Sequence, residues 1–122
     1  MHDDMVIQGR TFDLLDWLLP KIEYFPRIYR HTVVQRMMLV TLEFQETLIL
    51  AQGQQGREQL KSLKLCDMRL TQLRMYLRLI HRWHWLNDGQ YEHVSEMVAE
   101  IGRLLGGWIK KSGRKKGIPA SR

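Results

Sequence analysis

Between residues 58 and 85, apolar side chains recur in alternating steps of three and four residues. The members of this series are Leu63, Cys66, Leu70, Leu73, Leu77 and Ile80. An α-helix has about 3.6 residues per turn, so this spacing places all six side chains on one face. Such an apolar seam packs against other helices. The segment therefore predicts a long bundle helix.

Three breaks divide the 122 residues into four segments rich in helix-favouring side chains, and no alternating β pattern is present. The breaks are at Pro26, at residues 53–56 and at residues 87–89. The predicted helices span about residues 11–25, 29–52, 58–85 and 88–111. Short connections favour an all-α, up-down-up-down antiparallel four-helix bundle. We expect residues 1–111 to form this single domain and residues 112–122 to be a flexible basic tail.

The first two predicted helices differ in how much of their surface is apolar. The first carries a seam with Pro20 inside it, which predicts a kink or a restart of the helix. That seam consists of Phe12, Leu15, Leu18, Leu19, Ile22 and Phe25. The second helix is apolar on nearly every side, from Val33 to Leu50. A helix of that kind is buried on more than one side, so we expect a second subunit to cover it.

The fourth predicted helix opens with Asn87 and Gln90, which have the spacing of a capping box. Its seam consists of Val94, Val98, Ile101, Leu105 and Trp108. Gly102 and Gly106 are four residues apart, so they fall on one face and allow another helix to approach closely.

Positive charge is concentrated on the third helix and at the end of the chain. The sequence has 19 Lys and Arg against 13 Asp and Glu, a formal net charge of +6, which favours polyanionic partners. Six cations of the third helix fall within an arc of about 140°, which also holds Met68, Met75 and Leu79, whereas Arg69 lies outside it. A face that mixes cations with apolar side chains is typical of an interaction surface. The candidate interface residues are Arg57, Lys61, Lys64, Arg74, Arg78, Arg82, Lys110, Lys111, Arg114, Lys115 and Lys116.

No motif for catalysis, for a cofactor or for a metal emerges from the sequence. Phosphate-binding glycine loops, paired cysteines and Glu-x-x-His repeats are absent. His81 and His84 could meet on one helical face, but a polar helix end is the favoured interpretation. For Glu43 and Glu46 we favour pairing with arginines across an interface. Cys66 is interpreted as a small core residue.

Four aromatic residues accompany the basic clusters: Tyr76, Trp83, Trp85 and Trp108. They could stack on unpaired bases, but we favour a place in the core or in an interface. The lone cysteine, the acidic first residues and the lack of a long apolar run lead us to expect a cytoplasmic protein without a membrane partner.

Two segments carry a specific resemblance to a known family. Residues 73–79, Leu-Arg-Met-Tyr-Leu-Arg-Leu, and residues 100–109, Glu-Ile-Gly-Arg-Leu-Leu-Gly-Gly-Trp-Ile, resemble the accessory variability determinant (Avd) proteins of diversity-generating retroelements. Residues 18–20 and 25–27 lie where that family has an internal proline and a proline-basic break. The resemblance covers roughly residues 11–111. It departs from the family pattern at the turn of residues 83–85 and after Ser112.

This resemblance implies a four-helix protomer that assembles into a homopentameric barrel. It implies a non-catalytic accessory protein that binds the reverse transcriptase of the same retroelement together with RNA, and DNA as a further candidate. The protein would support mutagenic copying of template RNA into cDNA. Arg74 and Arg78 are the positions carried over as contacts.

Other classes stay open at this point. Four-helix proteins encoded in intervening sequences of ribosomal RNA genes are similar, and they would imply a structural or general nucleic-acid-binding oligomer. A scaffold whose charge serves only solubility, a small enzyme with a site in the bundle core and a membrane-surface protein rank lower.

Overall fold

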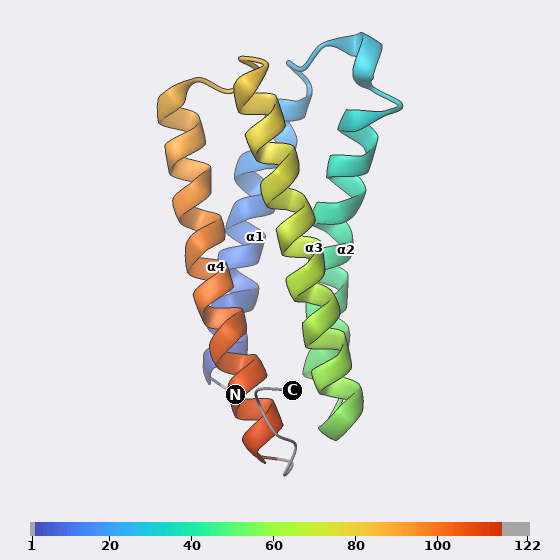
Figure 1. Ribbon diagram of the computed structural model, residues 1–122, viewed down its shortest axis with the longest axis vertical. Coiled ribbons are helices and arrows are strands. Elements are labelled where there is room, and N and C mark those ends of the chain that lie inside the picture. Colours follow the sequence, from blue (N-terminus) through green and yellow to red (C-terminus); the bar gives the residue numbers. More distant parts are fainter. Residues whose placement is uncertain (1, 116–122) are drawn as a thin grey trace.

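The computed structural model describes residues 2–115, which form four α-helices and one short 3₁₀ helix (Figure 1). The elements are α1 (His2–Ile22), η1 (Arg27–Tyr29), α2 (Val33–Gln52), α3 (Gly56–Arg82) and α4 (Asp88–Lys115). No strand occurs within these residues. The predicted all-α class is confirmed.

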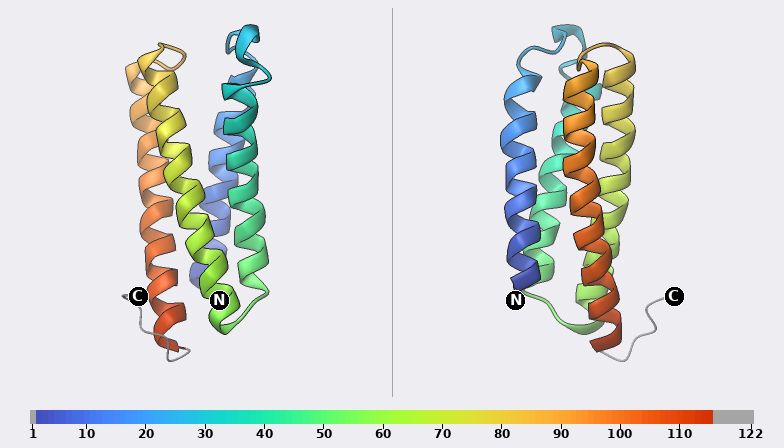
Figure 2. Two further views of the ribbon diagram at one scale, coloured as in Figure 1. Left: turned by 45° about the vertical axis from the view of Figure 1, so that its right-hand side comes forward. Right: turned by 90° about the vertical axis from the view of Figure 1, so that its left-hand side faces the viewer.

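The four helices form an antiparallel bundle in which each helix packs against the two next to it. The packed pairs are α1 with α2, α2 with α3, α3 with α4 and α4 with α1. Successive helices run up, down, up and down, as the views of Figures 1 and 2 show together. The connections α1–α2 and α3–α4 therefore lie at one end of the bundle. The α2–α3 turn and the end of α4 lie at the other.

The seams of α3 and α4 are the ones expected from the sequence. All six seam residues of α3 and all five of α4 are buried in one core. The capping box of α4 is also present. The Gln90 backbone N–H donates to Asn87 Oδ1 at 2.8 Å, and the Asn87 N–H donates to Gln90 Oε1 at 2.9 Å.

The seam predicted for α1 is wrong in part. The helix begins nine residues earlier than expected, and its buried line runs through Ile7, Thr11, Leu14 and Leu18. Phe12, expected in the seam, is 66% exposed. A pattern of apolar residues does not reveal this line, because Thr11 is polar. Its hydroxyl can be buried because it donates a hydrogen bond to the Ile7 carbonyl at 2.8 Å. The helix continues through Pro20 without a restart and ends at Ile22.

The start of α2 and the end of α3 also differ from the prediction. The chain forms η1 before α2 begins at Val33, four residues later than expected. At the end of α3, His84 adopts a left-handed φ of 65°. The Trp85 N–H donates to the Ile80 carbonyl at 2.9 Å, and the His84 N–H donates to the His81 carbonyl at 3.0 Å. These two bonds form a Schellman motif, which ends α3 at Arg82 instead of residue 85.

The helix α4 is longer than expected, which corrects the predicted tail. It continues to Lys115, and both Ser112 and Gly113 are buried. Ser112 Oγ donates to Gln59 Oε1 of α3 at 2.9 Å, so the last turns are fixed to the bundle. Residues 112–115 therefore belong to the domain. The rest of the predicted tail, residues 116–122 with Lys116, lies outside the described residues.

Candidate nucleic-acid interface

The six cations predicted on α3 are all exposed. They are Arg57, Lys61, Lys64, Arg74, Arg78 and Arg82. With a rise of about 1.5 Å per residue, the first and the last stand roughly 37 Å apart along the helix. Asp67, an acidic residue outside the predicted set, is also exposed on this face. One carboxylate among six cations leaves the face strongly positive.

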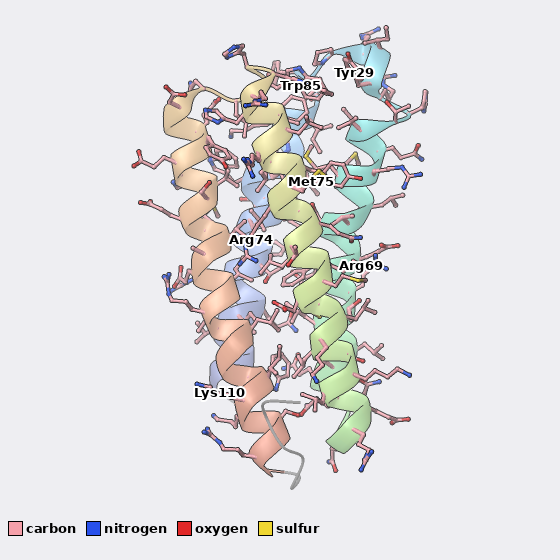
Figure 3. The ribbon with its side chains drawn as sticks, in the orientation of Figure 1. Tyr29, Arg69, Arg74, Met75, Trp85 and Lys110 are labelled. Carbon is pink, nitrogen blue, oxygen red and sulfur yellow. The ribbon has the colours of Figure 1, made fainter. Side chains whose placement is uncertain are left out.

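The antiparallel arrangement brings the cations from the end of α4 to the start of α3. Lys110, Lys111 and Arg114 are exposed on the last turns of α4. Because α3 starts at the end of the bundle where α4 finishes, these residues share that end with Arg57 and Lys61 (Figures 1 and 3). Two clusters far apart in sequence thus form one basic end.

The structure places Arg74 and Met75 on different sides of α3. Met75 lies on the side of α3 toward α2, and Arg74 lies on the side toward α4 (Figure 3). Arg69, outside the predicted arc, lies toward α2, where its Nε is 3.6 Å from Glu43 Oε1. The arc predicted from the sequence stays mixed on its outer face, and its edge beside α4 carries Arg74 and Arg78.

Arg74 and Arg78 occupy a groove between α3 and α4. A hollow of about 260 Å³ is bordered by both arginines and, from α4, by Tyr91, Ser95 and Val98. Its floor is mostly apolar, so the guanidinium groups stand at the rim of a partly dehydrated groove. Charged donors in such a place bind anions more strongly than fully hydrated ones do.

Gly102 makes room for Arg74. A Cβ atom at position 102 would lie 2.5 Å from Arg74 Nη2, whereas a Cβ atom at Gly106 would meet nothing within 4 Å. The sequence predicted that both glycines admit another helix. At Gly102, the space is instead occupied by the arginine side chain of the neighbouring helix.

Neither groove arginine forms an ion pair with a carboxylate of residues 5–114, whose side chains the structure describes. The ion pairs of the described chain lie elsewhere and include Arg10 with Glu100 at 3.0 Å. The hydrogen bond and the charge of Glu100 raise the pKa of Arg10 above its ordinary value. Arg74 and Arg78 have no such partner, so their charge is available to an external anion.

A comparison with protein families places the chain in a family. The model of the bAvd-like family matches residues 5–112, which is most of the chain. This chain belongs to the bAvd-like family. No curated protein matches it. Membership suggests an accessory protein of a diversity-generating retroelement, and Avd-like accessory proteins are generally non-catalytic.

In this bAvd-like protein, most of the acidic and histidine residues considered as catalytic or metal-binding candidates contact other side chains of the bundle. Glu43 pairs with Arg69 across the α2–α3 contact, as expected, and Glu46 is exposed without an ion pair to another described residue. His81 contacts Asp88 at 2.8 Å and stacks on Tyr91. No group of three or more His, Cys, Asp or Glu side chains within the described residues could hold a metal ion.

Cys66 and most of the aromatic residues are part of the core or packed on it. Burial raises the pKa of the Cys66 thiol to about 12, with a smaller effect of the Asp67 charge. Trp108 is buried, and Tyr76 and Trp85 pack against the core. Trp83 is the exception at 38% exposure. Across residues 2–115 of this Avd-type chain, no helix combines the length and apolarity needed to cross a membrane.

Proposed function

We propose that this protein is a non-catalytic accessory subunit that binds the reverse transcriptase of its retroelement and the nucleic acid being copied. The observation that carries the proposal is the α3–α4 groove, where Arg74 and Arg78 stand without a carboxylate partner in a chain of the bAvd-like family. Phosphates fit such a pair of guanidinium groups, because each guanidinium can donate two parallel hydrogen bonds to a phosphate.

The first experiment purifies the chain with the neighbouring reverse transcriptase and measures cDNA synthesis on the retroelement's own RNA. Synthesis that depends on this chain supports the accessory role. The double variant Arg74→Ala/Arg78→Ala should then lose most of that synthesis while still folding. The matched control is Arg10→Ala/Arg36→Ala, which removes the same charge from α1 and α2 and should keep synthesis.

Salt dependence provides a second readout on RNA alone. Each single-strand phosphate contact contributes about −0.7 to the slope of log K against log salt concentration. Removing Arg74 and Arg78 should therefore make the slope shallower by about 1.4. An unchanged slope would place the phosphate contacts on another surface.

The proposed assembly is a homo-oligomer, and the family resemblance makes a pentamer the expected form. Exposed large apolar side chains on α2 and α3 support this proposal. They are Leu39, Ile49, Leu50, Leu65, Met68 and Met75. The mass in solution tests the subunit count. The variant Leu50→Lys should dissociate the assembly, whereas Phe12→Lys, an exposed change on α1, should not.

If the chain neither binds the polymerase nor affects cDNA synthesis, the accessory role is wrong. A basic four-helix oligomer of the ribosomal intervening-sequence type would then be the better description. That type predicts general nucleic-acid binding without a polymerase requirement.

A further inference from the structure

Four aromatic rings meet at the bundle end that carries the α1–α2 and α3–α4 connections. The ring centroids of Tyr29 and Trp83 are 5.3 Å apart, as are those of Tyr29 and Trp85 and those of Trp83 and Trp85. Phe25 lies under this group, with its centroid 5.1 Å from that of Trp85, and is buried. We call Tyr29, Trp83 and Trp85 the aromatic platform; Figure 3 shows Tyr29 and Trp85 at this end.

The backbone fixes the platform before any ligand arrives. The left-handed His84 and the Schellman bonds reverse the chain between the two tryptophans. As a result, Trp85 turns onto the core while Trp83 stays at the surface, 38% exposed. Tyr29, the last residue of η1, is 36% exposed beside it. The two outer rings are therefore held in place at little further entropy cost on binding.

The segments that carry the platform rings also carry exposed cations. Arg27, Arg30 and Arg82 are exposed, and none of them makes an ion pair with another residue of the described chain. His31 and His84 are also exposed here. A hollow of about 420 Å³ at this end is bordered by Phe25, Arg27, Arg30, His31 and one carboxylate, Glu23. The end thus combines flat apolar rings with excess positive charge.

We propose that this end binds an unpaired stretch of RNA, with bases stacked on Trp83 and Tyr29 and phosphates held by Arg27, Arg30 and Arg82. Every nucleobase has a face that can stack on an aromatic ring, and cations beside the ring hold the phosphate chain. Bases of a duplex are already stacked on each other, so the platform selects single strands. A two-fold contact with a second copy of this chain is disfavoured here, because it would bring the same cations together.

The inference extends the proposed function, since it takes RNA as the partner, but it concerns a different surface. Arg82 lies eight residues after Arg74 on α3, roughly 12 Å along the axis. The groove would hold backbone phosphates of any nucleic acid. The aromatic platform would add a preference for unpaired bases.

The test compares binding of an unstructured RNA of roughly 12 nucleotides with binding of the corresponding RNA duplex. Trp83→Leu and Tyr29→Leu should each weaken binding of the single strand about 5- to 150-fold, the range for one lost base stack. Their binding of the duplex should stay within about twofold, because no base stack is lost there. The matched control is Trp17→Leu, because Trp17 is only partly exposed and its ring is covered by Lys21 Nζ, 3.9 Å from the centroid. Equal losses on both RNAs, or none, would overturn the inference.

Fluorescence provides a readout for a variant that keeps the fold. RNA bound at the platform should quench Trp83, so Trp83→Phe should lose part of the quenching while Trp17→Phe keeps all of it. Unchanged quenching in Trp83→Phe would place the RNA elsewhere and overturn the inference. So would a Trp83→Leu protein that loses the polymerase but not the RNA, because the platform would then be a polymerase contact.

The proposed function is decided separately, by whether cDNA synthesis requires the wild-type chain. A wild-type chain that binds neither the single-stranded RNA nor the duplex would overturn the platform inference. The cDNA synthesis assay would still test the contact with the polymerase. Single-strand binding that depends on Trp83, in a chain without effect on synthesis, would support the platform and refute the accessory role.

Discussion

Replacing Gly102 by alanine should stabilise the protein and yet weaken its binding of RNA. Alanine inside a helix is favoured over glycine by roughly 0.5–1 kcal/mol. The new methyl group would lie 3.6 Å from Leu70 Cδ2, an ordinary contact, but 2.5 Å from Arg74 Nη2. The end of a flexible side chain can move away, so we expect the helix to stay intact and the guanidinium to leave its place over α4.

Gly106 provides the matched control for this change. It lies one turn later on the same helix, and an added Cβ atom there would meet nothing within 4 Å. Gly106→Ala should therefore gain the full helix preference and raise Tm by roughly 2–6 °C. Gly102→Ala should gain somewhat less, since moving Arg74 offsets part of the benefit.

Gly102→Ala and Gly106→Ala should differ in their affinity for RNA. Hydrogen bonds to charged groups contribute about 1.5–3 kcal/mol, and Arg74 is displaced in Gly102→Ala but not removed. We expect a loss of affinity of up to about tenfold for Gly102→Ala and no loss for Gly106→Ala. The assay is a salt titration of RNA binding beside thermal unfolding of the same samples.

A double-mutant cycle decides whether the loss acts through Arg74. In an Arg74→Ala background, Gly102→Ala should cause no further loss of affinity. A further loss there, or equal affinities for the two glycine variants, would refute the reasoning. Position 102 would then act on the fold or on the helix as a whole.

Three further predictions concern stability and reactivity. His84→Gly should stabilise the protein by roughly 1 kcal/mol, because glycine adopts the left-handed conformation without strain; His93→Gly, within α4, should destabilise it by a similar amount, as measured by denaturant unfolding. Asn87→Ala should cost about 1 kcal/mol in the same measurement, since it removes the cap of α4. Cys66 should resist alkylation at pH 8 until the chain unfolds, because its pKa of about 12 against an ordinary 9.0 reduces the thiolate about 1000-fold. Because the folded pKa is the higher one, the stability gained from the neutral thiol is present below pH 9 and declines as the pH rises toward 12.

A specific result would contradict each of these predictions. A destabilised His84→Gly protein would mean that the imidazole contributes more than the backbone strain costs. An unchanged Asn87→Ala protein would mean that solvent replaces the cap. Rapid labelling of Cys66 in the folded protein would indicate that the α2–α3 contact opens readily.

The helical class, the seams of α3 and α4 and the cap of α4 could all be predicted from the sequence. Each of these rests on local spacing, which an α-helix converts into a face without help from the rest of the chain. The sequence also indicated the cationic face of α3 and the exposed apolar character of α2. The same local logic failed at α1, where a threonine takes a core position and an aromatic residue points outward.

How these faces meet depends on the packing of the helices, which the sequence pattern does not reveal. Helical periodicity gives an angle around one axis, but it does not say which neighbouring helix lies on which side. The packing of α3 between α2 and α4 directs Arg69 toward Glu43 and Arg74 over Gly102. The aromatic platform depends on contacts between Tyr29 and Trp83, more than fifty residues apart, and on a left-handed residue in a turn. Contacts of that range exist only after the helices have packed, so no local pattern encodes them.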